Sequence, residues 1–190
     1  MPFDDSDMHD DALMTLYANG DNTAASVLAS RHTSRVLALA FRMLNDAAEA
    51  EDVAQEAMMR LWKIAPEWRR GEAKVSTWLY KVASNLCLDR LRKTRNTALD
   101  DIPEPEDDAP SVEEAMLQQA RAASLQEALD ALPARQRLAV TLRHIEELSN
   151  PEIASVMEIS VEAVESLVSR GKRALSAMLV GQKAKIGFGT

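Results

Sequence analysis

Apolar side chains recur at every third or fourth position in two long stretches of the first half of the chain, residues 23–44 and residues 47–64. In the second stretch this spacing brings Val53, Ala57 and Leu61 onto one face and leaves polar side chains on the other. Each stretch is therefore predicted to be an amphipathic helix with one buried face.

A third helix is predicted to follow the polar loop of residues 69–74. Ser76 is suited to cap its first turn, because a serine hydroxyl can accept a hydrogen bond from a backbone N–H that has no partner within the helix. Apolar side chains then recur at helical spacing from Leu79 to Leu91, and the segment ends in basic residues.

The second half of the chain is predicted to contain four more helices, near residues 113–130, 134–146, 150–157 and 161–179. Ser149 and Glu152 have the spacing of a capping box at the start of the third of these helices. About three residues separate the last two helices, and apolar side chains on both can meet inside the angle between them. This arrangement is typical of a helix-turn-helix, although Glu158 stands in the turn where glycine is common.

Residues 96–112 separate the two groups of helices and carry three prolines, six acidic residues and no helical or strand period. Such a segment cannot bury enough apolar surface to become ordered, so it is predicted to be a flexible acidic linker. When stretched it would span on the order of 55 Å, so the two units need not touch. The prediction is two small helical domains, residues 1–95 and 113–180, with a frayed tail at residues 181–190.

The composition also favours an all-α fold. The 190 residues include only six glycines and seven prolines, and only 4% are aromatic. This is too few turn-forming residues for a β-sandwich or barrel. The single cysteine, Cys87, cannot form an internal disulfide and the three histidines stand far apart, so neither a metal site nor a cofactor is predicted. The acidic N-terminus is unlike a secretion signal, and no apolar run approaches the roughly 18 residues of a membrane span, which predicts a cytoplasmic protein.

Charge is divided unevenly along the chain. The net charge of −8 argues by itself against a nucleic-acid partner, but residues 60–95 sum to +7, whereas residues 1–59 sum to −8 and residues 96–110 to −6. The basic segment is suited to hold a melted DNA strand, which needs cations along the backbone and a pocket or an aromatic plane for an unstacked base.

Two blocks of sequence resemble one known family. Residues 52–56, Asp-Val-Ala-Gln-Glu, and residues 76–93, which begin Ser-Thr-Trp-Leu-Tyr, strongly resemble the core-binding and promoter-melting regions of bacterial extracytoplasmic-function sigma factors. Residues 131–137, residues 148–154 and the helix that follows look like the domain with which this family reads the minus-thirty-five promoter element. The resemblance covers about residues 20–95 and 115–178, with a linker where the family has one.

The resemblance implies a non-enzymatic protein that binds core RNA polymerase and promoter DNA, helps to melt the minus-ten region and is held inactive by an anti-sigma factor. Contacts with polymerase would involve the β′ coiled coil and the β flap. Asp52, Gln55 and Glu56 would lie on an exposed helix face that docks on the β′ coiled coil. Taken on charge alone, the same three residues could simply be a solvated helix face.

For the minus-ten element the candidate residues are Lys74, Thr77, Trp78, Lys81, Asn85, Arg90, Arg92 and Lys93. The resemblance implies that the loop at residues 69–77 and the start of the following helix read a base flipped out of the non-template strand. A tryptophan in the first turn of an amphipathic helix is more often a core residue than a stacking platform, so the pocket lining is assigned to Asn85 and the loop before it.

For the minus-thirty-five element the candidate residues are Arg135, Arg137, Glu162, Glu165, Ser166, Arg170, Lys172 and Arg173. The basic residues would contact phosphates, and Glu162, Glu165 and Ser166 would face the groove. The family usually carries Lys or Arg just after the position of Val164, where this chain has Glu165. A carboxylate can accept a hydrogen bond from cytosine N4, so a different base code is expected.

Two other functions account for less of the sequence. A stand-alone helix-turn-helix regulator would explain residues 113–180, but it leaves residues 52–56 and the basic segment 74–95 without a role. A nucleotide-dependent or metal-dependent enzyme lacks its motifs here, since the chain has neither a phosphate-binding glycine loop nor a cluster of histidine and cysteine.

Overall fold

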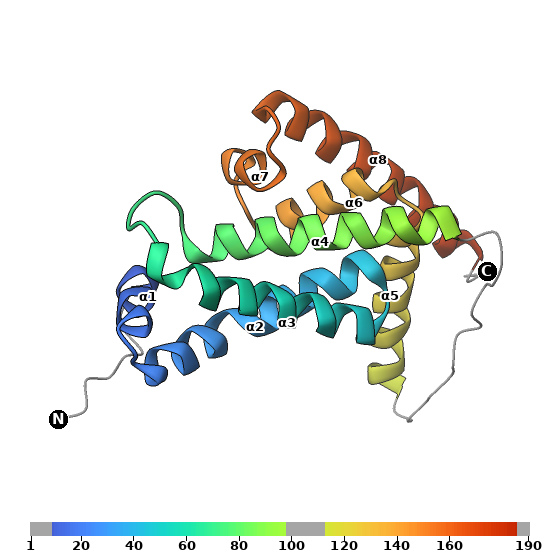
Figure 1. Cartoon of the computed structure of the whole chain (residues 1–190). Coiled ribbons are helices and arrows are strands. Elements are labelled where there is room, and N and C mark those ends of the chain that lie inside the picture. The colour runs from blue at the N-terminus through green and yellow to red at the C-terminus, as the bar shows by residue number, and fades with distance from the viewer. Residues whose placement is uncertain (1–8, 98–112, 186–190) are drawn as a thin grey trace.

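The computed structural model describes residues 9–97 and 113–185, and all regular structure in these residues is helical (Figure 1). The first unit consists of α1 (Asp10–Ala18), α2 (Asn22–Leu44), α3 (Ala47–Ile64), the 3-10 turn η2 (Ala65–Glu67) and α4 (Val75–Thr97). The second consists of α5 (Glu113–Asp130), α6 (Ala134–Val140), the π-helical turn η3 (Thr141–Ile145), α7 (Asn150–Met157) and α8 (Val161–Lys185). The predicted all-α class is confirmed.

Most of the predicted linker lies outside the described residues; its first two residues, 96 and 97, continue α4. The tail predicted from residue 181 differs from the structure, in which α8 continues to Lys185. In this last part of α8, Gln182 Nε2 donates a hydrogen bond of 3.2 Å to Glu127 Oε2 on α5. No helix in residues 9–97 or 113–185 combines the length and the apolar content that crossing a membrane requires.

Local hydrogen bonds explain where several helices begin. The Asp21 carboxylate accepts from the backbone N–H of Thr23 at the start of α2, and Asp46 does the same for Glu49 in α3. The predicted capping box of α7 is present, with Glu152 Oε2 accepting from Ser149 N at 2.8 Å. These caps satisfy backbone donors that the helices themselves leave unpaired.

Helix α1 was not predicted from the sequence. It has only nine residues, and contacts with α2 hold it in place. Leu13 and Met14 are fully buried, and the Asp10 carboxylate lies 2.7 Å from His32 Nε2 and 2.8 Å from Arg31 Nη1. The hydrogen bond with His32 is the main reason that the pKa of Asp10 lies below its ordinary value, although burial opposes this shift.

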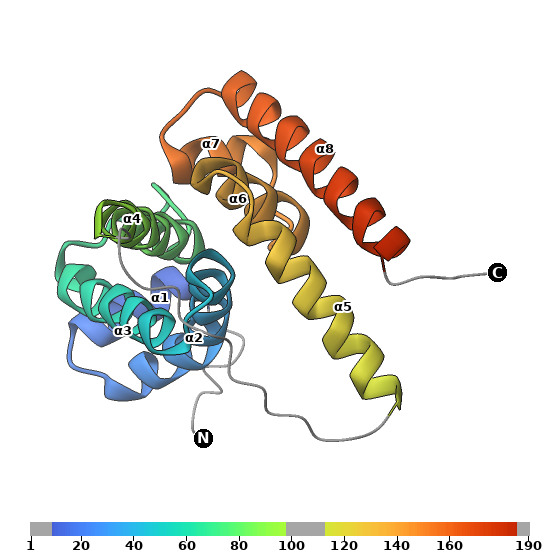
Figure 2. The ribbon, with the colours of Figure 1, turned by 90° about the vertical axis from the view of Figure 1, so that its right-hand side faces the viewer.

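The two units share one hydrophobic core. Leu138, Leu142, Ile153 and Val164 of the second unit are fully buried in the same cluster as the apolar faces of α2, α3 and α4. Figures 1 and 2 show α6 and α7 lying against α4. A smaller cluster around Leu129 joins α5, α6 and α8. The two units, which the linker length would allow to stay apart, are therefore packed together in this structure.

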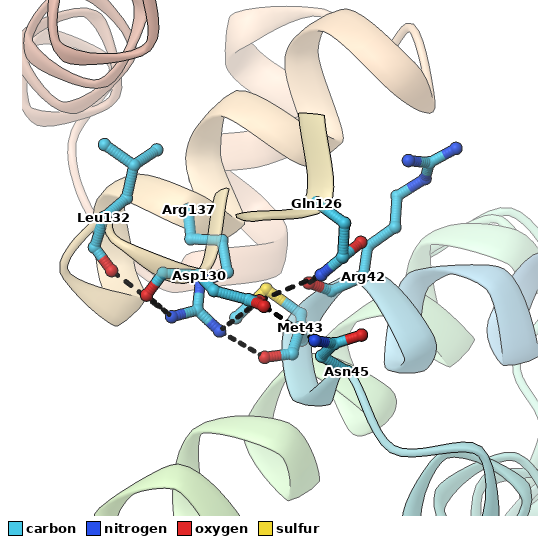
Figure 3. A network of polar contacts seen from close by, with 7 residues as sticks. All are labelled: Arg42, Met43, Asn45, Gln126, Asp130, Leu132 and Arg137. Carbon is cyan, nitrogen blue, oxygen red and sulfur yellow. Dashed lines mark hydrogen bonds and ion pairs between the residues drawn. The ribbon is translucent and has the colours of Figure 1, made fainter. Parts of the chain in front are cut away.

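The C-terminus of α2 is one point at which the second unit docks (Figure 3). The last carbonyls of a helix have no partner within it. Here the Arg137 guanidinium donates to the carbonyl of Met43, and Gln126 Nε2 donates to that of Arg42 at 3.0 Å. The negative end of the helix dipole also favours a guanidinium at this position. Asn45, which follows α2 with φ +50°, donates to Asp130 Oδ2 at 2.8 Å.

Helices α6 and α8 approach closely at Gly171. A Cβ atom at this position would lie 2.4 Å from the γ2 methyl of Val140, which is buried and β-branched. Glycine therefore permits a contact that no other residue allows without movement of its neighbours.

Gly171→Ala is expected to lower the free energy of unfolding by about 1–3 kcal/mol through overpacking, despite the better helix propensity of alanine. Gly181→Ala is the matched control, because it lies on the same helix and nothing stands within 4 Å of its added methyl. That variant should be neutral or stabilising by up to about 1 kcal/mol. Urea denaturation measures both, and equal effects of the two variants would contradict the close-contact explanation.

Candidate functional site

The outer face of α3 carries the first group of predicted residues. Asp52 and Gln55 are exposed and Glu56 is half-buried, so the structure brings all three to one surface. They line a shallow cavity of about 530 Å³ whose other lining residues are Met59, Arg60, Lys63 and Arg90.

Met59 is the apolar residue of this cavity, and sequence reasoning missed it together with Arg60 and Lys63. Met59 is 66% exposed, although methionine is usually buried. The available signal was its position one turn after Gln55, on the polar face of an otherwise regular amphipathic helix. Two ion pairs border it: Arg60 Nη2 to Glu56 Oε1 at 2.6 Å, and Arg90 of α4 with Glu49. An apolar side chain framed by charges is the usual composition of a protein-docking surface.

The predicted minus-ten residues lie along α4 and the loop before it. Thr77, Lys81 and Asn85 follow one another at four-residue intervals and so share one face of the helix. Asn85, Arg92 and Lys93 are exposed, whereas the Arg90 guanidinium is engaged with Glu49. The two lysines nearest the start of the helix, Lys74 and Lys81, contact the second unit.

The loop between η2 and α4 contains a cavity of about 210 Å³. Its lining residues are Ile64, Glu67, Trp68, Arg69, Glu72, Ala73 and Trp78. The rings of Trp68 and Trp78 meet edge to face with centroids 6.2 Å apart. Trp78 is half-buried and packs against the core, as its position predicted, but it also forms a wall of this cavity. Asn85, the expected lining residue, is absent from it.

Helices α7 and α8 form the predicted helix-turn-helix. Ile153 and Val164 are fully buried on the inner faces of the two helices. Glu158 occupies the turn with φ +55°, the left-handed conformation that glycine adopts more easily. Ser160 Oγ then accepts from the backbone N–H of Ala163 at 3.1 Å and caps α8.

The exposed side of α8 carries most of the predicted minus-thirty-five residues. Glu162, Glu165, Ser166, Arg170, Lys172 and Arg173 are all exposed. Their spacing places acidic and hydroxyl groups near the N-terminus of the helix and basic groups further along the same side. Arg135 on α6 is exposed as well.

Arg137 does not belong to this surface, and its predicted phosphate contact needs correction. Its side chain is 9% exposed, and it donates to the carbonyls of Met43, Asp130 and Leu132. Burial lowers the pKa of its guanidinium, and the carboxylate of Asp130 at 3.7 Å opposes that shift. A phosphate must reach a guanidinium from solvent, so this packing is inconsistent with DNA binding by Arg137.

Three carboxylates of the second unit contact α4 or the residue just before it. Glu152 lies 3.3 Å from Lys74 Nζ, and Glu158 lies 2.7 Å from Lys81 Nζ. Between these two ion pairs, the Tyr80 hydroxyl donates to Glu146 Oε2 at 2.7 Å. Burial and this carboxylate together raise the pKa of Tyr80. In this arrangement the helix-turn-helix therefore covers part of the basic face that would hold DNA.

Comparisons with known proteins match a family model to each of the two units. The family described as Sigma-70 region 2 matches residues 28–97, and Sigma-70, region 4 matches residues 122–175. The chain is 32% identical over 181 residues to the RNA polymerase sigma-H factor of Pseudomonas aeruginosa, covering 90% of this chain and 93% of that protein. It is 30% identical over 171 residues to the ECF RNA polymerase sigma factor SigW of Bacillus subtilis, covering 84% and 91%.

A solved structure is similar as well. CnrH, in complex with the cytosolic domain of CnrY, matches with a TM-score of 0.67 and 27% identity, over 90% of this chain and 97% of that one. The first matched region contains α3 and α4, and the second contains α6, α7 and most of α8, which include the helix-turn-helix. This chain therefore belongs to the extracytoplasmic-function group of the sigma-70 family of RNA polymerase sigma factors, which are transcription initiation factors and not enzymes.

Proposed function

We propose that this protein joins core RNA polymerase through the outer face of α3, directs it to promoters and helps to melt them with α4 and the preceding loop. The observation that carries the proposal is the presence of both surfaces beside a helix-turn-helix on one chain. A stand-alone regulator would need only the helix-turn-helix, and it would leave the exposed Met59 and the acidic groups around it unexplained.

In this proposal the β′ coiled coil of polymerase docks on the cavity formed by Asp52, Gln55, Glu56 and Met59. Met59 supplies apolar area that loses water on binding, and the surrounding acidic and amide groups set the orientation of a basic partner. The second unit would contact the β flap. Polymerase binding at these two places would put the DNA-reading surfaces of both units on one promoter.

Gln55→Ala combined with Glu56→Ala is expected to weaken holoenzyme formation by about tenfold or more while leaving the fold intact, because neither side chain fills the core. Competition binding to core polymerase measures the effect. Glu51→Ala is the matched control, since Glu51 is exposed on α3 but does not line the cavity. Unchanged affinity of the double variant, together with an unchanged melting temperature, would remove the docking assignment.

For promoter melting, the basic side chains of α4 would follow the backbone of the non-template strand. One flipped base would enter the cavity between Trp68 and Trp78, where an indole ring offers a stacking surface. The exposed groups of α8 would enter the major groove of the minus-thirty-five element, with Glu165 accepting from a cytosine.

Regulation by an anti-sigma factor is part of the proposal. CnrH, the similar structure, holds the cytosolic domain of a second protein, CnrY. A partner of this kind would control when the present protein reaches polymerase, and the site of action would be the cytoplasm, where polymerase and promoter DNA meet.

A further inference from the structure

The loop of residues 68–74 is bonded to α1, which lies outside the residues matched by either sigma-70 region. The Asp11 carboxylate accepts two hydrogen bonds from this loop. One comes from Trp68 Nε1 to Oδ1 at 2.8 Å, and the other comes from the backbone N–H of Gly71 to Oδ2 at 3.1 Å. A single side chain thus connects the beginning and the middle of the loop.

A second contact lies one turn further along α1. The Arg70 guanidinium donates from Nε and Nη2 to Thr15 Oγ1, at 3.1 and 3.0 Å. The Thr15 hydroxyl in turn donates to the backbone carbonyl of Asp11 at 3.1 Å. Asp11 and Thr15 therefore form one polar surface of α1 that holds three loop positions.

The conformation of the loop makes these bonds important for its shape. Residues 69–74 are exposed and belong to no helix, so little apolar burial fixes their position. Gly71 has φ +81°, a left-handed conformation that its bond to Asp11 holds in place. Hydrogen bonds to a charged acceptor are stronger than neutral ones, so the Asp11 carboxylate is a strong anchor.

Trp68 connects this anchor to the cavity. Its ring is a wall of the 210 Å³ cavity and meets Trp78 edge to face. The Asp11 bond to Nε1 limits rotation of this ring, and the bond to Gly71 sets the path of the chain that carries Arg69 and Glu72 into the same cavity.

We infer that Asp11 is a positioning residue for promoter recognition: it holds the loop in the shape that selects one base at the minus-ten element. The inference rests on the proposed function, in which this cavity receives a flipped base. Asp11 itself contacts the loop and not the DNA. It acts by keeping the cavity closed to the bases that do not fit, so its loss relaxes selectivity more than it reduces activity.

The test is transcription by holoenzyme containing Asp11→Ala, on promoters varied one base at a time. The preference for the best minus-ten base over the other three is expected to fall by about tenfold, within the range that one good base contact supplies. Dependence on the minus-thirty-five element and polymerase affinity should not change. Asp11→Asn keeps one acceptor oxygen, so its preference for the best minus-ten base should lie between that of the wild-type protein and that of Asp11→Ala. Hydrogen exchange at the Gly71 amide should accelerate in Asp11→Ala, which reports the loop directly.

Two comparisons decide the outcome. Asp10→Ala removes a neighbouring acid that bonds α2 and not the loop. If it relaxes base preference equally, a general loosening of α1 is the cause and the role of Asp11 is overturned.

Arg69→Ala and Glu72→Ala alter the cavity wall directly. If they change base preference and Asp11→Ala does not, the inference fails while the proposed function stands; if none of them changes it, the base-binding role of the cavity fails as well.

Discussion

Covalently linking position 81 to position 158 is expected to reduce transcription to background. In the structure Lys81 of α4 and Glu158 of the helix-turn-helix form an ion pair of 2.7 Å, so a link between them holds the two units together. Elements named minus-ten and minus-thirty-five lie about 25 base pairs apart, or about 85 Å along B-DNA. A compact chain of this length has a radius of gyration of about 16 Å, so the packed form cannot reach both elements at once.

The experiment uses Lys81→Cys with Glu158→Cys and a cleavable bis-maleimide. The chain's own Cys87 does not interfere, because it is buried and burial raises the pKa of its thiol to about 12. Each single variant treated with the reagent is a control for the loss of one charge. Cleaving the linker should restore transcription to the level of the double cysteine variant that was never linked. Full activity of the linked protein would mean that initiation proceeds from the packed arrangement.

Arg137→Ala is expected to lower the free energy of unfolding by about 2–4 kcal/mol, because each buried acceptor left without its donor costs about 1–3 kcal/mol. The variant leaves the carbonyls of Met43 and Asp130 without their donor and Asp130 without its cation. Since these groups lie where the second unit meets α2, the loss should appear as earlier separation of the two units in urea.

Arg135→Ala is the matched control for this prediction. Arg135 lies two residues earlier on the same helix and is exposed, so its removal should change stability by no more than about 0.5 kcal/mol. The opposite pattern, weaker promoter binding with unchanged stability in Arg137→Ala, would restore the phosphate-contact role that the sequence predicts for Arg137.

The sequence predicted the regular helices well because their signals are local. Apolar spacing and caps such as Ser149 with Glu152 depend on residues within one or two turns, so helices α2 to α4 and the helix-turn-helix appear near their predicted bounds. Helix α1 lacked such a signal, because its stability comes from Asp10 and from buried side chains that meet α2, more than ten residues away.

The candidate site was predictable to the extent that side-chain exposure follows helical periodicity. Asp52 and Gln55 lie on the surface for that reason. Arg137 does not, since charge pattern alone cannot reveal that the carbonyl of Met43, at the end of α2, stands opposite it and accepts its hydrogen bond. The ion pair of Lys74 with Glu152 could not be predicted from the sequence either, because it depends on how two units separated by a linker pack together.

Glu158 has two opposite effects on stability. Its left-handed backbone costs free energy for any residue with a side chain, so the isolated helix-turn-helix would gain stability from glycine. Its carboxylate, however, pairs with Lys81, which glycine could not do. Glycine at this position would therefore stabilise the helix-turn-helix and remove one exposed ion pair, of about 0–1 kcal/mol, from the contact between the two units. Glutamate at this turn thus makes the DNA-reading unit slightly less stable by itself and favours its contact with α4.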